Sequence, residues 1–132
     1  MNPSQLVLDT DIVINLLKKQ DEVVAQFLTL VESKTSILIS PIVVAEIYAG
    51  AYPREHKDIE AFFSLCQLVT TDADIARTAG GYANRYRKAF QGISLEDYLL
   101  AATARNHRCP LWTGNRKHYP MDDIAFFKPV ED

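Results

Sequence analysis

With 132 residues, of which 48% are hydrophobic and 23% charged, the chain has the composition of an ordinary globular protein and is short for two domains. We therefore expect one domain over residues 1–132. The net charge of −3 favours no class of partner, and the longest apolar runs stop well short of the ~20 residues of a membrane span. The N-terminus lacks a secretory signal, which predicts a cytoplasmic protein without membrane association. Cys66 and Cys109 lie in apolar contexts without metal-ligand spacing and are expected to be buried free thiols.

The charges are divided unevenly along the chain. Residues 1–76 hold eleven acids and five bases, whereas residues 77–132 hold six acids and nine bases. Two segments of the second half, 77–93 and 98–121, contain no acid. Basic segments of this kind can neutralise phosphates, although a solvated basic face gives the same pattern.

The sequence alternates between short apolar runs and amphipathic stretches. In chain order these predict a strand at 5–9, helices at 11–19 and 22–33, a strand at 36–40, helices at 41–51 and 54–66, a strand at 67–71, helices at 73–90 and 95–107, and strands at 109–113 and 123–129. Ser40, Asp72 and Ser94 stand where a helix N-cap is expected. Gly80 and Gly81 should weaken or kink their helix.

Strands that are separated by helices, with few hairpin signals, predict an α/β fold of three α/β/α layers. The central sheet is expected to be mostly parallel, with about four to five strands. Ligands of such sheets gather at the carboxyl ends of strands, near the switch in strand order. Asp9 ends the first strand and Asn115 closely follows the fourth, so both are expected at that edge.

Two further acids interrupt apolar stretches. Glu46 lies in "PIVVAEIYAG" and Asp97 in "SLEDYLLAATA". A carboxylate among apolar neighbours is costly unless it is paired, hydrogen-bonded or bound to a cation. Brought together with Asp9, these carboxylates would suit Mg²⁺ or Mn²⁺, which can activate a water molecule against a phosphodiester. Beside basic segments, such a site indicates a nuclease.

Each acid also has a structural explanation. Asp11 is well placed to favour the start of the following helix, and Glu46 could pair with an arginine. Asp97 stands three residues after Ser94, which is the spacing of a capping box. The segment "VLDTDIV" also fits the signature of haloacid-dehalogenase phosphatases, with Asp9 as nucleophile. That alternative leaves Glu46 and Asp97 without a role.

Four motifs resemble those of the PIN-domain ribonucleases, in particular the VapC-type toxins of toxin–antitoxin pairs. They are "VLDTDIVINLL", "SPIVVAEIYAG", "GISLEDYLLAATA" and "LWTGNRKHYP", and the resemblance covers nearly the whole chain. It implies Asp9, Glu46 and Asp97 as the acids that bind the metal. Asn115 matches a fourth position that is Asp in many relatives, and Thr113 matches a polar position beside it. Tyr119, where the family more often has Phe, suggests no chemical consequence.

The same resemblance implies a Mg²⁺- or Mn²⁺-dependent endoribonuclease that cuts structured RNA, such as tRNA or rRNA, and inhibits translation. It also implies a homodimer and a cognate antitoxin that covers the active-site groove. A PIN-like module that binds RNA or protein without catalysis is the remaining alternative. His118 is expected to be structural. The candidates for contacts with the RNA backbone are basic residues of the acid-free segments: Arg116, Lys117, Arg85, Arg87 and Lys88.

Overall fold

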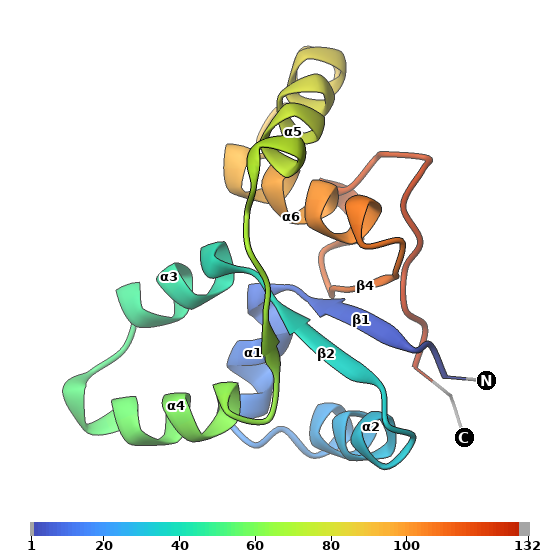
Figure 1. The fold of residues 1–132 in the computed structure, drawn as a ribbon. Helices are drawn as coiled ribbons and strands as arrows, with labels where there is room; N and C mark the ends of the chain where they lie inside the picture. The colour runs from blue at the N-terminus through green and yellow to red at the C-terminus, as the bar shows by residue number, and fades with distance from the viewer. Residues whose placement is uncertain (1, 130–132) are drawn as a thin grey trace.

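The computed structural model of the protein describes residues 2–129 (Figure 1). Its elements in chain order are β1 (Gln5–Leu8), α1 (Thr10–Leu17), α2 (Asp21–Glu32), β2 (Ser36–Ile39), α3 (Pro41–Ala49), the 3₁₀ helix η1 (Pro53–Glu55), α4 (His56–Phe63), β3 (Gln67–Leu68), α5 (Ala73–Tyr86), α6 (Leu95–Asn106), β4 (Leu111–Trp112) and the 3₁₀ helix η2 (Arg116–His118). No helix of the described residues is long and apolar enough to cross a membrane.

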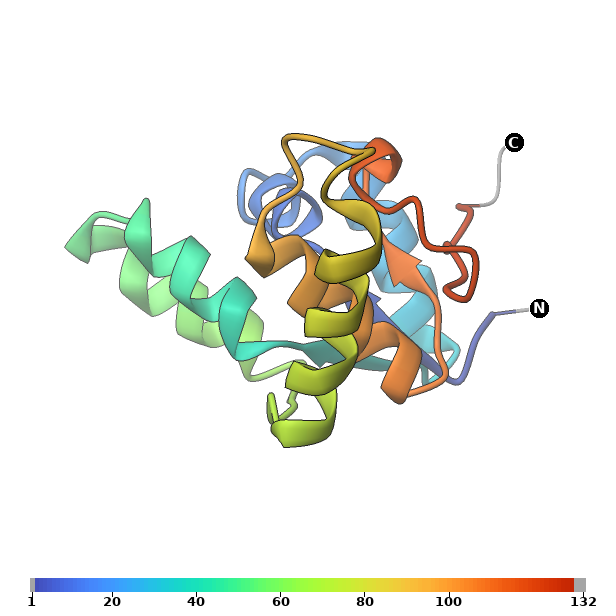
Figure 2. The same ribbon diagram turned by 90° about the horizontal axis from the view of Figure 1, so that it is seen from above.

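The four strands form one sheet in the order β3-β2-β1-β4, and every pairing is parallel. Figure 1 shows α5 and α6 above the sheet and α1 and α2 below it, which confirms the predicted three-layer α/β/α fold. α3 and α4 project to one side in both views (Figures 1 and 2).

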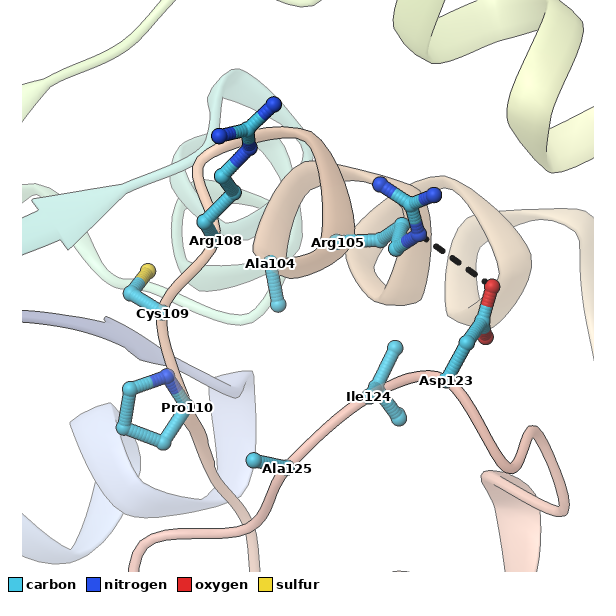
Figure 3. A pocket seen from close by; sticks show the side chains of 8 residues that line it. All are labelled: Ala104, Arg105, Arg108, Cys109, Pro110, Asp123, Ile124 and Ala125. Atoms are coloured by element: carbon cyan, nitrogen blue, oxygen red, sulfur yellow. Dashed lines mark hydrogen bonds and ion pairs between the residues drawn. The ribbon is translucent and has the colours of Figure 1, made fainter.

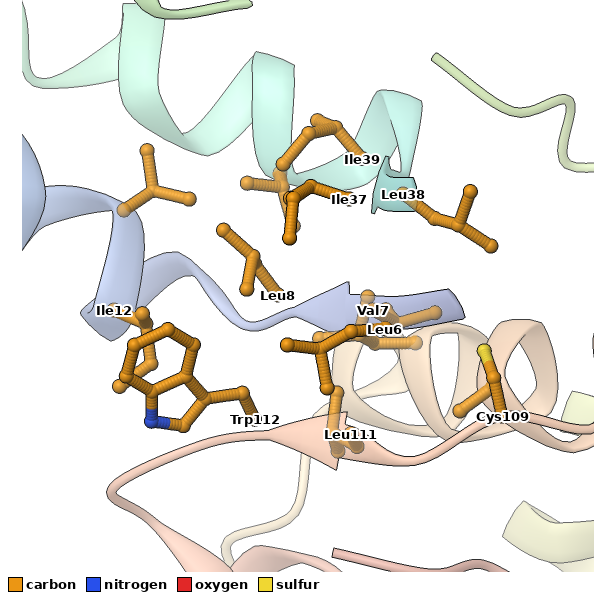
Figure 4. Packing of buried hydrophobic residues seen from close by; sticks show 14 of the residues in the cluster. Leu6, Val7, Leu8, Ile12, Ile37, Leu38, Ile39, Cys109, Leu111 and Trp112 are labelled. Carbon is orange, nitrogen blue, oxygen red and sulfur yellow. The ribbon is translucent and has the colours of Figure 1, made fainter. Parts of the chain in front are cut away.

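β1, β2 and β4 are largely buried and consist mostly of apolar residues, as is usual for parallel strands covered on both faces, whereas β3 at the edge of the sheet is exposed. Leu6, Val7 and Leu8 of β1 are fully buried, as are Leu38 and Ile39 of β2. Figure 4 shows these side chains packed with Leu111 and Trp112 of β4 and with Ile12 of α1. This apolar core holds the carboxyl ends of β1 and β4 in a defined position. Cys109 is buried, Cys66 is half-buried, and both are free thiols.

The predicted N-caps are confirmed at three helices. Ser40 Oγ accepts the Ile42 N–H, Asp72 Oδ1 accepts the Ile75 N–H, and Ser94 Oγ accepts the Asp97 N–H. α5 is a single helix that continues through the two glycines and ends at Tyr86, earlier than predicted.

The predicted fifth strand at 123–129 is wrong. Only Phe126 pairs with the sheet, through a single parallel bridge to Leu111. Leu111 donates to the Ala125 carbonyl and accepts from the Phe127 N–H, both at 2.9 Å. β4 contains two residues before the chain turns away, so it offers too short an edge for another strand.

The order of the strands creates a switch point at β1. From β1 the chain proceeds through α1 and α2 to β2 on one side, and it returns through α5 and α6 to β4 on the other side. The Asp9 N–H donates to the Trp112 carbonyl at 2.9 Å and extends the pairing of β1 with β4. The residues that follow these two strands therefore meet at the carboxyl edge, as expected for a ligand site.

Candidate active site

Asp9 is the centre of the site at the carboxyl edge. It is the N-cap residue of α1, and its Oδ1 accepts the Thr10 N–H at 2.7 Å. Its Oδ2 accepts from the Thr113 hydroxyl at 2.7 Å and from the Tyr119 hydroxyl at 2.9 Å. The N-cap is thus Asp9, and Asp11 lies in the first turn. Both carboxylate oxygens of Asp9 are fixed, one by the helix and one by the segment after β4.

Asp97 approaches Asp9 from the first turn of α6. Its Oδ2 accepts the Ser94 N–H at 3.1 Å and completes a capping box. Its Oδ1 lies 3.5 Å from the Tyr119 hydroxyl, the same group that donates to Asp9. Asp97 therefore caps α6 and faces the site with one carboxylate, so the two roles that the sequence left as alternatives are compatible.

Tyr119 joins the two carboxylates from a buried position. Burial and the charges of Asp9 and Asp97 raise the pKa of its phenol far above the ordinary value, so the hydroxyl keeps its proton and donates it. A phenylalanine could not make these contacts. The prediction that a tyrosine here has no chemical consequence is therefore wrong.

Glu46 reaches the site less directly. Its Oε1 accepts from the Thr10 hydroxyl at 2.8 Å, which places it one residue from Asp9. The sequence placed Glu46 among apolar neighbours, whereas the structure exposes it on α3. Because α3 projects from the sheet, only Val43 and Ile47 of this apolar helix are buried. The Glu46 carboxylate is therefore not buried, and it needs no partner to offset a cost of desolvation.

Asn115 and His118 form the far side of the site. The Asn115 N–H donates to the Thr113 hydroxyl at 2.9 Å, and the Asn115 amide nitrogen lies 3.0 Å from His118 Nδ1. The same ring nitrogen lies 3.2 Å from Asp97 Oδ2. A ring nitrogen donates or accepts according to its tautomer, so Nδ1 donates to Asp97 only when it carries the proton. His118, expected to be structural, thus contacts two of the predicted site residues.

Asp11 connects the start of α1 to the turn after β4. Its Oδ2 accepts the Gly114 N–H at 2.8 Å and its Oδ1 accepts the Ile12 N–H at 2.9 Å. Burial raises the pKa of its carboxyl, the negative charge of Asp9 raises it further, and these backbone hydrogen bonds oppose the rise. Asp9 and Asp11 thus bring two acidic groups close together at this edge.

Gly114 has no room for a side chain. A Cβ atom there would lie 2.7 Å from Asp11 Oδ2, which is closer than real contacts allow. Gly114→Ala should therefore displace the turn and cost about 1 kcal/mol in the free energy of unfolding, the usual net worth of one hydrogen bond. Urea denaturation measures this cost.

Two further variants control the Gly114→Ala experiment. Gly80→Ala, at an open position within α5, should stabilise the protein by about 0.5–1 kcal/mol. Removing Asp11 first, in Asp11→Ala, should reduce the cost of Gly114→Ala, because the clash is with the Asp11 side chain. If Gly114→Ala lowers the free energy of unfolding as much in the Asp11→Ala protein as in the wild type, the clash is not with the Asp11 side chain.

The donor chemistry of the site fits a hard divalent cation. Residues 2–129 contain no group of three Asp, Glu, His or Cys side chains arranged to hold a metal ion. Mg²⁺, however, is usually bound by one or two carboxylates, with water and substrate phosphate in the other positions. Asp9 and Asp97 converge on one hydroxyl and supply such a pair. A cation there would also offset the charge of Asp9, which adds to the effect of burial in raising the pKa of Asp11.

The predicted basic residues lie at two places. Arg116 and Lys117 are exposed on η2, and Arg116 stacks over the Phe126 ring and donates to the Phe127 carbonyl. Arg85, Arg87 and Lys88 are exposed where α5 ends.

One of these residues can be placed relative to Asp97. Burial and then the charge of Asp97 raise the pKa of the Tyr98 phenol, while the Arg87 guanidinium lowers it. Arg87 is therefore within electrostatic range of the residue that follows Asp97.

A cavity of about 480 Å³ lies at the opposite, amino edge of the sheet (Figure 3). It is lined by the end of α6, the turn before β4 and residues 123–125. Arg105 is ion-paired there with Asp123 at 3.2 Å, and Arg108 stands on the rim. No predicted site residue lines this cavity, and we assign the site to the carboxyl edge.

Sequence reasoning missed two contributors to the site. Tyr119 is separated from Asp9 by 110 positions, so no local pattern could reveal their contact. Gly114 carries a usable signal, because a glycine directly after a buried strand and before Asn115 often marks a tight backbone approach.

Comparisons with known proteins identify the family of this fold. Residues 6–125 match the family model described as PIN domain. The chain is 36% identical over 115 residues to "Ribonuclease VapC19" of Mycobacterium tuberculosis, which covers 87% of this chain and 92% of that protein. The structure of VapBC2 from Rickettsia felis, bound to a promoter DNA fragment, is similar with a TM-score of 0.83 at 21% identity, over 93% of this chain and 97% of that one.

A second solved complex has the same fold. DNA-bound VapBC from Salmonella typhimurium superimposes with a TM-score of 0.81 at 21% identity, over 95% of this chain and 98% of that one. The family match excludes the phosphatase alternative suggested by "VLDTDIV". The chain therefore belongs to the PIN-domain family, as a VapC-type member of it.

Proposed function

We propose that this chain is a divalent-metal-dependent endoribonuclease and the toxin of a toxin–antitoxin pair. The observation that carries the proposal is the convergence of Asp9 and Asp97 on the Tyr119 hydroxyl, at the switch point of a PIN-domain sheet. The 36% identity to a protein named as a ribonuclease supports the same reaction class.

The residues of the site divide into those that hold the cation and those that position them. Asp9 and Asp97 would hold Mg²⁺ or Mn²⁺, and Glu46, which is linked to the site through the Thr10 hydroxyl, is the third predicted ligand. A bound cation supplies Lewis-acid activation of the attacking water and positive charge for the scissile phosphate. Tyr119 and Thr113 fix Asp9, and Asn115 orients the water that attacks the phosphate. His118 Nδ1 positions Asp97 when it carries the proton and accepts from the Asn115 amide when it does not.

The RNA lies across this edge, and its phosphate backbone contacts the exposed basic side chains of η2 and of the end of α5. Lys117 has no side-chain partner among residues 2–129 and is free to contact a phosphate, whereas Arg116 is partly held by Phe126 and Phe127. The substrate class that we propose is structured RNA, tRNA or rRNA, whose cleavage stops translation in the cytoplasm.

A second cavity supports an antitoxin as the partner. It has a volume of about 290 Å³ and lies between α1, α3 and α4, with Glu46 on its wall and Ile14, Leu17 and Ile59 among its apolar lining. An antitoxin segment with apolar side chains could fill this cavity and cover the carboxylates. The similar solved structures are complexes of VapB with VapC. We further propose that the toxin forms a homodimer.

Incubation of the purified chain with total cellular RNA and Mg²⁺ tests the proposal. We expect new 5′ ends at defined positions within tRNA or rRNA, mapped by sequencing, and their disappearance when the cognate antitoxin is added. RNA binding without new ends, with Mg²⁺ or Mn²⁺, would instead establish a non-catalytic RNA-binding module.

Tyr119→Phe should weaken the metal dependence of cleavage. The substitution removes the donor shared by Asp9 and Asp97 and keeps the buried ring. Loss of such a supporting hydrogen bond usually costs 10–100-fold in metal affinity, so we expect the Mg²⁺ concentration for half-maximal cleavage to rise by about tenfold. Tyr98→Phe is the matched control, because it removes a buried hydroxyl without a partner in the described structure. Equal Mg²⁺ dependence of the two variants would refute this role.

A further inference from the structure

An exposed aromatic side chain marks the loop between α5 and α6. Phe90 is 43% exposed, and its N–H donates to the Tyr86 carbonyl at 2.9 Å. Its ring packs edge-to-face on Tyr86 with centroids 6.1 Å apart, and Tyr86 in turn lies 6.3 Å from Tyr82. Phe90 is therefore the outer end of an aromatic row whose inner end is buried.

The charges around Phe90 are positive and largely uncompensated. No acid lies between Asp74 and Glu96 in the sequence. Arg85 stacks over the Tyr86 ring at 5.4 Å from its centroid. Arg87 and Lys88 have no ion pair or side-chain hydrogen bond within residues 2–129.

The fold places this loop beside the candidate active site. The loop ends at Ser94, whose capping box fixes Asp97 three residues later. Asp97 in turn contacts His118 of η2 at 3.2 Å. Figure 2 shows the loop and η2 at the same edge of the molecule. RNA that occupies the carboxylate site would therefore run along the loop that carries Phe90.

We propose that Phe90 is a stacking platform for a base of single-stranded RNA, with Arg87 and Lys88 on the adjacent phosphates. An exposed aromatic ring within a basic segment is a combination that binds single-stranded nucleic acid. Any nucleobase can stack on the ring, and each Lys or Arg that neutralises a phosphate releases the counterions of that phosphate. The inference rests on the proposed function, since it places the same RNA. It adds a requirement for an unpaired base next to the cleavage site.

A second copy of the chain is the competing occupant of this surface. A two-fold interface centred on Phe90 would bring Arg87 and Lys88 of both copies together, and such like-charge contacts are unfavourable. An RNA strand has the opposite charge. The observed charges therefore favour RNA.

The test is the binding of a single-stranded oligouridylate to the full chain in EDTA, where the proposed cleavage cannot occur. We expect Phe90→Ala and Phe90→Leu to weaken binding by at least about fivefold, the lower end of the range for one stacked base. Phe90→Tyr and Phe90→Trp should bind as the wild type does. RNA should also quench the emission of the Phe90→Trp variant, whereas Trp112 is only 4% exposed and should respond little.

Leu28→Ala is the matched control, because Leu28 is also an exposed apolar residue and belongs to α2, which lies on the opposite side of the sheet from α5. It should leave RNA binding unchanged. If Phe90→Ala binds the oligouridylate with unaltered affinity, the inference is overturned and Phe90 has no role in binding. If Phe90→Ala sediments as a monomer where the wild type sediments as a dimer, the inference is overturned in favour of an interface between two copies.

The outcomes for the two proposals can be separated. If the wild type cleaves RNA and Phe90→Ala cleaves and binds it equally well, only the stacking inference is overturned. Binding that depends on Phe90, without cleavage in Mg²⁺ or Mn²⁺, retains the platform and overturns the nuclease. Absence of both binding and cleavage overturns both proposals.

Discussion

Asp97→Asn should reduce the rate of RNA cleavage by more than about 100-fold. Replacement of a residue that only supports a metal ligand already lowers metal affinity or activity by about 10–100-fold. The substitution removes the negative charge that faces Asp9 and the cation. It keeps an oxygen that can accept the Ser94 N–H, and the bond from the Asp97 N–H to Ser94 Oγ involves only the backbone of residue 97. The start of α6 should therefore survive, and the rate of cleavage under saturating Mg²⁺ is the measurement.

Glu96→Gln provides the matched control for this experiment. Glu96 is the adjacent acid in the same turn of α6, it is exposed, and its replacement makes the same change in charge. We expect nearly unchanged cleavage by Glu96→Gln, and similar urea midpoints for both variants. An Asp97→Asn protein with full activity, or an equal loss in Glu96→Gln, would remove Asp97 from the proposed machinery.

Removal of divalent metal should abolish cleavage and also lower the stability of the fold. EDTA leaves Asp9 and Asp97 without a counter-ion, so the charge of Asp9, which after burial is the second cause of the raised pKa of Asp11, is not offset. Added Mg²⁺ binds the native state preferentially and should stabilise it by about 1.4 kcal/mol at ten times its dissociation constant. Cleavage assays and thermal melts with and without Mg²⁺ measure the two effects.

The stability measurement distinguishes specific binding from a general salt effect. KCl at matched ionic strength should not reproduce the rise in melting temperature, and Mg²⁺ should not raise it in Asp97→Asn. Cleavage that persists after treatment with EDTA would contradict the metal dependence, whatever the melts show.

The sequence predicted most elements because their signals are local. The first four predicted strands, N-caps such as Ser40 and Asp72, and the capping box of Ser94 depend on neighbours within a few positions, and these are present. The errors occurred where a long-range partner decides the outcome. Phe126 reads as part of a strand, yet β4 is too short to pair with more than one residue of that segment.

For the site, the sequence by itself predicted that Asp9 and Asn115 would lie at the carboxyl edge of a parallel sheet, and it marked Glu46 and Asp97 as acids within apolar stretches. The tertiary structure decided how these groups meet: Tyr119 joins the two carboxylates, Asp11 holds the Gly114 turn, and Glu46 is exposed rather than buried. The physical reason is that hydrogen bonds across 22 to 110 positions depend on how β1, β4 and α6 pack together, which no local pattern of residues specifies.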